Sequence, residues 1–522
     1  MPRPKIDLVH CCFNKTADIK TDKQPFQLTD NINKYKYTAA IGGKIMRRTK
    51  IICTLGPASG DKKTVNKMID AGMNVARLNF SHGTHEGHQK YIDMVKEIRK
   101  ERGCPLAIML DTKGPEIRTG TIKDGTVKLC EGQDFTLTSR NVEGNEKEVS
   151  ISYASLPSQL KKGNTILIDD GAIKLTVNST TDTDIFCTVD AGGRLSDRKG
   201  INVPYVAVDM PYLSEQDKSD LLFGIENDVD FVAASFVRSK DDVIALRKFI
   251  DYNGGHDIRI ISKIENLQGI EAFDEILELS DGIMVARGDM GVEVEYERLP
   301  GLQKRFIRKC YRAGKMVITA TQMLESMISR QLPTRAEITD VANAVFDGTS
   351  AVMLSGETAS GKFPVKSVCA MAKIAEQAEN DAFDIATFRG IKYDMDSKDT
   401  TNAVCDAACT TAKDIDAAAI IALTKYGQTA RRMSKFRPDV PIVAATPVEK
   451  TFHQLSLSWG VYPVIARYQN TTDQLFVHAV DCAKQIDLVS DGDRVVVVAG
   501  IPLDTPGNTN ILKVELVGNQ LR

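Results

Sequence analysis

The sequence has no continuous apolar run near the ~20 residues that a membrane-spanning helix needs. It also has almost no net charge, −2 over 522 residues, so no global positive field is available to attract nucleic acid. No Cys-x-x-Cys pair occurs among its 11 cysteines, several of which lie inside apolar runs. This pattern favours reduced, buried thiols over disulfides or a zinc site. We therefore expect a cytoplasmic protein that binds neither membranes nor nucleic acid.

Residues 1–45 lack the apolar run of ~7–15 residues that a secretory signal needs. The segment is moderately basic, but Asp7, Asp18, Asp22 and Asp30 make a transit peptide the less favoured alternative. We interpret it as an N-terminal extension, partly ordered at best. The whole length suggests about three or four domains.

A strand–helix rhythm runs from residue 46 to residue 383. Apolar runs of strand length are followed by helix-like segments, with Glu215–Glu226 and Lys240–Tyr252 as examples. Eight strands with intervening helices predict a (β/α)₈ TIM barrel over residues 46–114 and 209–383. The predicted strands are Ile51–Leu55, Asn74–Phe80, Leu106–Leu110, Phe231–Phe236, Ile258–Ile264, Ile283–Ala286, Met316–Ala320 and Ala351–Leu354. The other predicted helices are Thr64–Ala71, His88–Arg102 and Gly269–Leu279.

The rhythm is interrupted once, between the third and the fourth strand. Residues 115–208 alternate apolar and polar positions in short runs, such as Thr165–Ile168 and Ile173–Val177, between glycine and Asn/Asp turns. This pattern predicts an inserted all-β module, a small barrel. Because the insertion leaves from a loop on the catalytic face, we expect it to act as a lid. A second α/β pattern predicts an open α/β domain over residues 384–522, ending in the strand Ile511–Leu516.

Charged residues end two consecutive predicted strands. Lys263 and Glu265 are one residue apart and so point the same way on a strand, and Asp289 follows the next strand. In a TIM barrel the strand C-termini carry the chemistry, and one cation with two carboxylates there suits a divalent metal and a phosphate. The alternative is a pair of buried ion pairs that only closes the barrel. Two apolar strands that both end in charge make this alternative less favoured.

The other strand ends supply cations and neutral oxygens. Arg77 and Arg118 provide positive charge for a phosphate or a carboxylate. Gly288 lets the backbone approach a ligand, and the following turn could present N–H groups to a carboxylate. A single carboxylate among neutral oxygens suits a large monovalent cation better than Mg²⁺, and this mixture occurs at Asn79, Ser81, Asp111 and Thr112.

The histidines His82, His85 and His88 have a spacing that a metal cluster could use. Because their segment starts a predicted helix, we prefer solvated or capping roles for them. No Ser/His/Asp or Cys/His order stands out in the sequence.

Long blocks of this sequence resemble the pyruvate kinase family. They occur in the family's order, span the predicted barrel and flank the insertion, so the resemblance covers about residue 46 to the end. The insertion and the C-terminal domain match in position and type. The blocks are Lys50–Ser59, Asn74–Gly83, Asp111–Gly120, Ser262–Asn266, Met284–Gly291, Ala320–Met327 and Asp340–Thr358.

The resemblance implies the final step of glycolysis, in which phosphoenolpyruvate, ADP and a proton give pyruvate and ATP. It implies Mg²⁺, which Mn²⁺ can replace, on Glu265 and Asp289. It also implies K⁺ on the oxygens of Asn79, Ser81, Asp111 and Thr112. In the family a carboxylate at the position of Glu116 goes with K⁺ dependence, so we expect a K⁺ requirement.

The resemblance also implies roles for the remaining residues. Lys263 would lie against the phosphoryl group in flight, and Arg77 and Arg118 would bind substrate oxygens. Thr321 would help deliver the proton to the enolate, and the amides of Gly288 and Asp289 would bind the carboxylate. The nucleotide would be faced by Asn79, His82 and Lys199.

The C-terminal domain resembles the family's regulatory domain. Its effector loop corresponds to a turn between a strand and a helix, a good phosphate cradle, with Thr424, Lys425, Gly427 and Thr429 as candidate contacts. Tyr426 and Gln428 replace the small or basic residues of members that respond to fructose 1,6-bisphosphate. The loop 500–504 also lacks the basic or aromatic contacts of those members. We expect weak or no activation by this sugar; an ordinary strand–helix turn is the alternative.

Two other functions fit the residues less well. Another Mg²⁺-dependent barrel enzyme, such as an aldolase-like lyase, would not need the K⁺ ligands, the lid or Lys263. A catalytically silent paralogue that serves as a binding subunit would be expected to have lost Lys263, Glu265 or Asp289. The family is homotetrameric, and we expect the same here. The sequence leaves open whether GDP replaces ADP.

Overall fold

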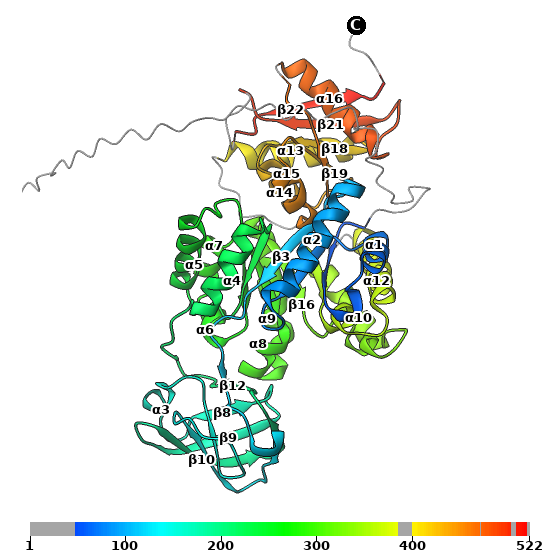
Figure 1. The fold of residues 1–522 in the computed structure, drawn as a ribbon. Coiled ribbons are helices and arrows are strands. Elements are labelled where there is room, and N and C mark those ends of the chain that lie inside the picture. Colours follow the sequence, from blue (N-terminus) through cyan, green and yellow to red (C-terminus); the bar gives the residue numbers. More distant parts are fainter. Residues whose placement is uncertain (1–46, 385–398, 470, 503–507, 519–522) are drawn as a thin grey trace, which may run out of the picture.

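The computed structural model describes residues 47–384, 399–469, 471–502 and 508–518. They form a central barrel with a small β module at one end and an α/β domain at the other (Figure 1). The predicted N-terminal extension, residues 1–45, lies outside the described residues. No helix in the described ranges is both long and apolar enough to cross a membrane.

Eight parallel strands close the barrel in the order β1, β17, β16, β15, β14, β13, β3, β2. This confirms the predicted (β/α)₈ architecture, with the insertion between the third and the fourth barrel strand. The strands are β1 (Lys50–Thr54), β2 (Val75–Asn79), β3 (Ala107–Asp111), β13 (Phe231–Ala234), β14 (Arg259–Ile264), β15 (Gly282–Ala286), β16 (Met316–Ala320) and β17 (Ala351–Leu354).

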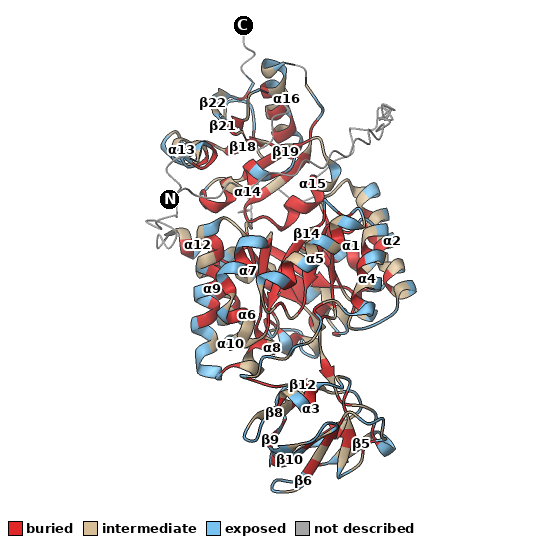
Figure 2. Ribbon diagram, turned by 90° about the vertical axis from the view of Figure 1, so that its left-hand side faces the viewer, coloured by how far each residue is buried: buried red, intermediate tan, exposed pale blue. Residues whose placement is uncertain are grey.

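Both faces of the barrel strands are buried, which explains their continuous apolar runs (Figure 2). Outward residues such as Ile51 and Leu78 pack among the surrounding helices. Inward residues such as Ile52 and Phe231 fill the interior, and Leu457 of the C-terminal domain belongs to the same cluster. The C-terminal domain therefore closes the barrel end opposite the lid.

Helices surround the barrel, and most begin or end where a local signal predicts. Thr84 Oγ1 accepts a hydrogen bond from Gly87 N (3.3 Å), so α2 begins three residues earlier than expected. The single helix predicted over Gly269–Leu279 was wrong. It is two helices, because Ala272, at φ −85° and ψ 12°, departs from helical geometry. The helices are α1 (Lys62–Asp70), α2 (His85–Arg102), α4 (Glu215–Glu226), α5 (Lys240–Tyr252), α6 (Leu267–Glu271), α7 (Phe273–Leu279), α8 (Arg287–Glu293), α9 (Leu299–Ala313), α10 (Arg335–Phe346), α11 (Gly356–Ala359) and α12 (Pro364–Asp384).

The inserted module, which we call the lid, is one curled sheet with a short ribbon. Its main sheet has the order β4, β12, β8, β9, β10, β6, β7, and β11 pairs with β5. The two edge strands meet, because Gly120 N donates to Ser150 O (2.7 Å) and Ser152 N donates to Arg118 O (2.9 Å). This closure agrees with the predicted small barrel. The strands are β4 (Ile117–Arg118), β5 (Thr126–Lys128), β6 (Asp134–Thr138), β7 (Glu148–Ser150), β8 (Thr165–Ile168), β9 (Ile173–Thr180), β10 (Asp184–Ala191), β11 (Arg194–Ser196) and β12 (Gly200–Asn202), with one short helix, α3 (Leu156–Gln159).

The C-terminal domain is the predicted open α/β sheet, in the order β20, β19, β18, β21, β22. Its last strand is antiparallel to its neighbour. Helix α16 packs on one face of the sheet, and α13 and α14 pack on the other. The strands are β18 (Ala419–Leu423), β19 (Ile442–Thr446), β20 (Val461–Ile465), β21 (Arg494–Ala499) and β22 (Ile511–Leu516). The helices are α13 (Thr400–Asp414), α14 (Gln428–Lys435), α15 (Glu449–Gln454) and α16 (Thr472–Gln485).

Candidate active site

Lys263 lies at the centre of a buried charge cluster at the strand C-termini. Its Nζ is 3.0 Å from Asp111 Oδ1, 3.0 Å from Glu265 Oε1 and 2.7 Å from Ser235 Oγ. An ammonium group has three N–H donors, so each donor has one acceptor. Burial lowers the pKa of Lys263, but Asp111 and Glu265 together outweigh it and hold that pKa above its ordinary value. The lysine is therefore a fixed positive charge.

Arg77 on β2 supplies a second fixed cation. Its Nε lies 2.6 Å from Asp111 Oδ2, and its guanidinium donates to Thr54 Oγ1 (2.8 Å). Burial alone would raise the pKa of Asp111, but Arg77 and Lys263 hold it below the ordinary range. One ionised carboxylate thus orients both cations, which were predicted from separate strand ends.

Glu265 and Asp289 leave this cluster short of positive charge. Glu265 is buried, and its Oε2 accepts a hydrogen bond from Phe236 N (2.6 Å). Burial raises the pKa of Glu265 to about 7, and the charge of Asp289 adds to this although Lys263 opposes it. When all three carboxyl groups are ionised, two cations face three carboxylates and one negative charge is in excess.

This excess charge fits a divalent cation bound by Glu265 and Asp289. Among the described residues, no group of three or more His, Cys, Asp or Glu side chains could hold a metal. A hard cation such as Mg²⁺ often takes only one or two protein carboxylates and fills its other positions with water and substrate oxygens. Glu265 and Asp289 are two such carboxylates at this rim.

The four oxygen-bearing residues of the predicted monovalent site lie at or just after the ends of the neighbouring strands β2 and β3. Asn79 at the end of β2 is paired in register with Asp111 at the end of β3. Asn79 Oδ1 accepts from Ser81 N (3.2 Å), and Thr112 Oγ1 accepts from Ser235 N (3.1 Å). The fold therefore brings the four predicted residues to two adjacent strand ends, and their binding of a cation stays a prediction.

Thr321 and Gly288 contact each other across the rim. Thr321 Oγ1 accepts from Gly288 N (2.8 Å) and donates to Ala320 O (2.6 Å). Thr321 has a φ of +66°, a left-handed conformation that is strained for a β-branched residue. Arg287, next to Gly288, pairs with Asp340: its Nη1 lies 2.7 Å from both carboxylate oxygens. The Thr321 hydroxyl is thus both an acceptor and a donor in this structure.

The two lid cations expected at the active site, Arg118 and Lys199, are paired within the lid itself. Arg118 on β4 donates to Glu116 Oε2 (2.8 Å) and to Arg198 O (2.8 Å). The Nζ of Lys199 lies 2.8 Å from Asp169 Oδ1. The structure therefore does not join these two side chains to the Lys263 cluster, and His82 is likewise exposed on the loop after β2. A cavity of about 410 Å³, with Glu116 and Asp289 among its lining residues, separates the lid from the barrel.

Two functional contacts were missed in the sequence. Ser235 directly follows the fourth barrel strand and Thr54 ends the first, and each contacts a cation of the cluster. The rule that strand ends carry the chemistry would have found both, had it been applied to all eight strands. The predicted strand Phe231–Phe236 also ran too far. It stops at Ala234, because Phe236 has a φ of +54°.

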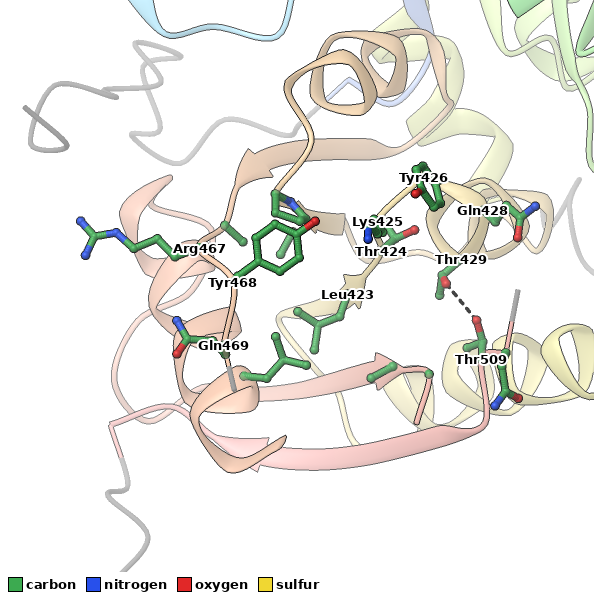
Figure 3. A pocket seen from close by; sticks show the side chains of 17 residues that line it. Leu423, Thr424, Lys425, Tyr426, Gln428, Thr429, Arg467, Tyr468, Gln469 and Thr509 are labelled. Atoms are coloured by element: carbon green, nitrogen blue, oxygen red, sulfur yellow. Dashed lines mark hydrogen bonds between the residues drawn. The ribbon is translucent and has the colours of Figure 1, made fainter. Parts of the chain in front are cut away.

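A second pocket, in the C-terminal domain, is lined in part by the predicted effector loop (Figure 3). Its cavity measures about 150 Å³. Gly427 precedes α14 with a φ of +78° and caps it with no side chain, so the helix starts with open N–H groups. Thr429 Oγ1 lies 2.8 Å from Thr509 Oγ1, and Lys425 Nζ lies 5.6 Å from the ring centroids of both Tyr426 and Tyr468. Arg467 points away from the cavity (Figure 3). Of the predicted tail loop 500–504, positions 503 and 504 lie outside the described residues.

The fold and the charged rim define a lidded (β/α)₈-barrel enzyme of the phosphotransferase class. A family model for the pyruvate kinase barrel domain matches residues 46–368, and a model for the pyruvate kinase alpha/beta domain matches residues 402–515. The chain belongs to the pyruvate kinase family.

Curated relatives support this assignment across nearly the whole chain. Pyruvate kinase of Clostridium acetobutylicum is 48% identical over 473 residues, covering 90% of this chain and 100% of the relative. Pyruvate kinase of Clostridium perfringens is 45% identical, with 90% and 100% covered. Pyruvate kinase of Staphylococcus haemolyticus is 45% identical, with 91% and 81% covered. The chain is thus a kinase that transfers the phosphoryl group of phosphoenolpyruvate to ADP in glycolysis.

Proposed function

We propose that Lys263 and Arg77 stabilise the phosphoryl group during its transfer. The arrangement of Lys263, with its three donors on Asp111, Glu265 and Ser235, is the observation that supports this. Among the described residues Ser235 is the one uncharged acceptor of Lys263, so a phosphoryl oxygen can replace it without separating an ion pair. The two cations would then stabilise the equatorial oxygens while the bond to the enolate oxygen breaks and the bond to ADP forms.

Thr321 would deliver the proton that the reaction consumes. The amides of Gly288 and Asp289, at the N-terminus of α8, would bind the carboxylate of phosphoenolpyruvate. A carboxylate bound there would take the Gly288 N–H from Thr321 Oγ1, and the hydroxyl would then turn its own O–H from Ala320 O toward the enolate. The enolate carbon would then gain its proton from this hydroxyl, directly or through a water molecule, and become the methyl group of pyruvate.

Glu265 and Asp289 would hold Mg²⁺, and Mn²⁺, which also binds hard oxygen ligands, would substitute for it. The bound metal would supply the positive charge that neutralises phosphoryl oxygens. Arg118 would bind substrate oxygens after leaving Glu116. The excess negative charge of the bare cluster supports this assignment.

K⁺ would bind to the oxygens of Asn79, Ser81, Asp111 and Thr112. Because Glu116 carries a carboxylate rather than an ammonium group, no lysine at that position replaces the ion, and we expect activity to require K⁺. The test compares turnover in KCl with turnover in tetramethylammonium chloride at equal ionic strength. Full activity in the organic cation would contradict the K⁺ assignment.

The nucleotide would lie between the lid and the barrel, facing Asn79, His82 and Lys199. Lys199 would exchange Asp169 for a nucleotide phosphate when the lid closes, since that ion pair lies within the lid. No described contact specifies the base. Comparing kcat/KM for ADP and GDP measures the preference, and Lys199→Met is expected to raise the KM for both diphosphates.

The decisive experiment measures pyruvate formation from phosphoenolpyruvate and ADP with Mg²⁺, in wild type and Glu265→Gln. The matched control is Glu297→Gln, which neutralises an exposed glutamate outside the cluster. Turnover that is lost only in Glu265→Gln supports the proposed rim. Turnover retained in folded Glu265→Gln would overturn the metal assignment.

The pocket of the C-terminal domain would bind a phosphorylated effector through Thr424, Lys425, Gly427 and Thr429. Fructose 1,6-bisphosphate has two phosphate groups, but among the described lining residues only Lys425 offers a cation inside the cavity. We therefore expect this sugar to activate weakly or not at all. A large drop in the half-saturating phosphoenolpyruvate concentration on its addition would contradict this.

We also expect a cytoplasmic homotetramer, as the family resemblance implies. A symmetric oligomer would let an effector shift all four active sites together. Light scattering coupled to size-exclusion chromatography tests the state, and a monomer of 57.3 kDa would contradict it.

A further inference from the structure

The loop between β2 and α2 carries three of the proposed ligand residues. Asn79 ends the strand, and Ser81 and His82 follow before Thr84 caps the helix. Phe80 N donates to Asp111 O (2.9 Å), and His82 N donates to Asn79 O (3.2 Å). These bonds hold the start of the loop but leave the carbonyl group of His82 to another partner.

His88, on the first turns of α2, supplies that partner. Its Nε2 lies 2.8 Å from His82 O, and its ring stacks on Phe80 with centroids 4.1 Å apart and planes 17° apart. A carbonyl oxygen only accepts hydrogen bonds, so Nε2 must carry the proton. Burial lowers the pKa of His88, and its Nδ1 has no hydrogen-bond partner among the described residues, so the neutral ring is favoured.

The loop also packs closely against this ring. Gly83 has a φ of +86°, which favours glycine, and a Cβ placed there would lie 3.3 Å from His88 Nε2. The backbone at Gly83 can thus approach the imidazole, which is itself buried. Loop and ring form one packed unit rather than a chance contact.

We propose that His88 is a positioning residue that fixes this loop for a monovalent cation. The hydrogen bond to His82 O holds the backbone that carries Ser81, and the stacking on Phe80 holds the backbone next to Asn79. A cation bound by several neutral oxygens requires them at matched distances, and partners outside the ligand shell maintain such distances. The inference rests on the proposed cation site and deepens it.

His85 offers a matched control on the same helix. Its Nε2 lies 2.6 Å from Asp220 Oδ1 on α4, and its ring stacks on Phe223 with centroids 4.5 Å apart. It makes no described hydrogen bond to the loop. Removing its imidazole should loosen the packing of α2 without freeing the His82 carbonyl.

The experiment measures the binding affinity of Tl⁺, a probe for K⁺, by calorimetry in tetramethylammonium buffer. His88→Met removes the donor, His88→Gln keeps an N–H donor on a chain of similar length, and His85→Met is the control. We expect His88→Met to weaken Tl⁺ binding by about tenfold, with most of the affinity kept in His88→Gln and in His85→Met. The K⁺ concentration for half-maximal activity should rise in His88→Met more than the KM for phosphoenolpyruvate does.

Wild-type affinity in folded His88→Met, or an equal loss in His85→Met, would overturn the role of His88. If circular dichroism shows His88→Met unfolded, His88→Gln decides: retained Tl⁺ affinity supports the role, and lost affinity overturns it. No Tl⁺ binding in wild type would instead overturn the proposed cation site, and this inference with it. The two failures are therefore distinguishable.

Discussion

Replacing Ser235 with alanine should weaken the unliganded protein but tighten its binding of phosphoenolpyruvate. Ser235 Oγ is buried, accepts a hydrogen bond from Lys263 Nζ (2.7 Å) and donates one to Thr112 O (2.6 Å). Its Oγ also lies 3.2 Å from Asp111 Oδ1, and alanine removes all three contacts. Lys263 loses only its neutral partner, because its other two partners are the carboxylates of Asp111 and Glu265.

The magnitude follows from which state contains each hydrogen bond. A hydrogen bond to a charged group contributes about 1.5–3 kcal/mol, and a neutral one about 0.5–1.5 kcal/mol. The unliganded variant should therefore lose about 2–4.5 kcal/mol of stability. In the substrate complex a phosphoryl oxygen would satisfy Lys263 in both proteins, so the cost of the Lys263 bond disappears. Phosphoenolpyruvate should bind the variant about tenfold more tightly, equivalent to about 1.4 kcal/mol.

The assay is calorimetric titration of phosphoenolpyruvate without ADP, together with the thermal midpoint of each protein. Ser262→Ala is the matched control, because Ser262 Oγ is also buried and lies 2.7 Å from Ser280 Oγ. Although Ser262 precedes Lys263 in β14, its side chain points to the opposite face of the strand. It should lower the midpoint without changing substrate affinity. Equal or weaker binding of phosphoenolpyruvate to Ser235→Ala would refute the exchange, since Ser235 would then remain a partner of Lys263 in the complex.

Three further predictions concern other parts of the chain. Glu265→Gln should lower kcat at least about a hundredfold and weaken Mn²⁺ binding measured by electron paramagnetic resonance; unchanged Mn²⁺ affinity would contradict its role. Burial, with Arg47 adding, lowers the pKa of Lys50 from 10.5 to about 7. Between these two pKa values the native state binds fewer protons than the unfolded state. The contribution of Lys50 to the free energy of unfolding is therefore complete above pH 10.5 and is lost as the pH falls toward 7. Lys50→Met should therefore flatten the rise of the thermal midpoint between these pH values, and an unchanged slope would count against it. Lys425→Met should abolish inorganic phosphate binding at the effector loop in a calorimetric titration, and retained binding would exclude Lys425 as a contact.

The amino-acid sequence was enough to predict the order of the elements and the kind of chemistry at their ends. Parallel strands buried on both faces must be apolar throughout, so their runs were visible and β16 and β17 have the predicted bounds. Because strand C-termini meet at one rim, Lys263 and Glu265 could be expected near Asp289 without any structure. Local signals were less decisive for helix bounds, as the break at Ala272 shows.

The tertiary structure alone decided which side chains satisfy one another. Lys263 and Asp111 are 152 residues apart in the chain, yet strand order and register bring them to 3.0 Å. Ser235 is uncharged, so its sequence position alone did not suggest a role. Its importance comes from accepting a hydrogen bond from Lys263, whose other two partners are carboxylates. Lys199 shows the reverse, since a cation expected at the nucleotide is held by Asp169 within the lid. Periodicity reports whether a residue is buried, whereas the partner of a buried charge depends on distances that only the closed barrel sets.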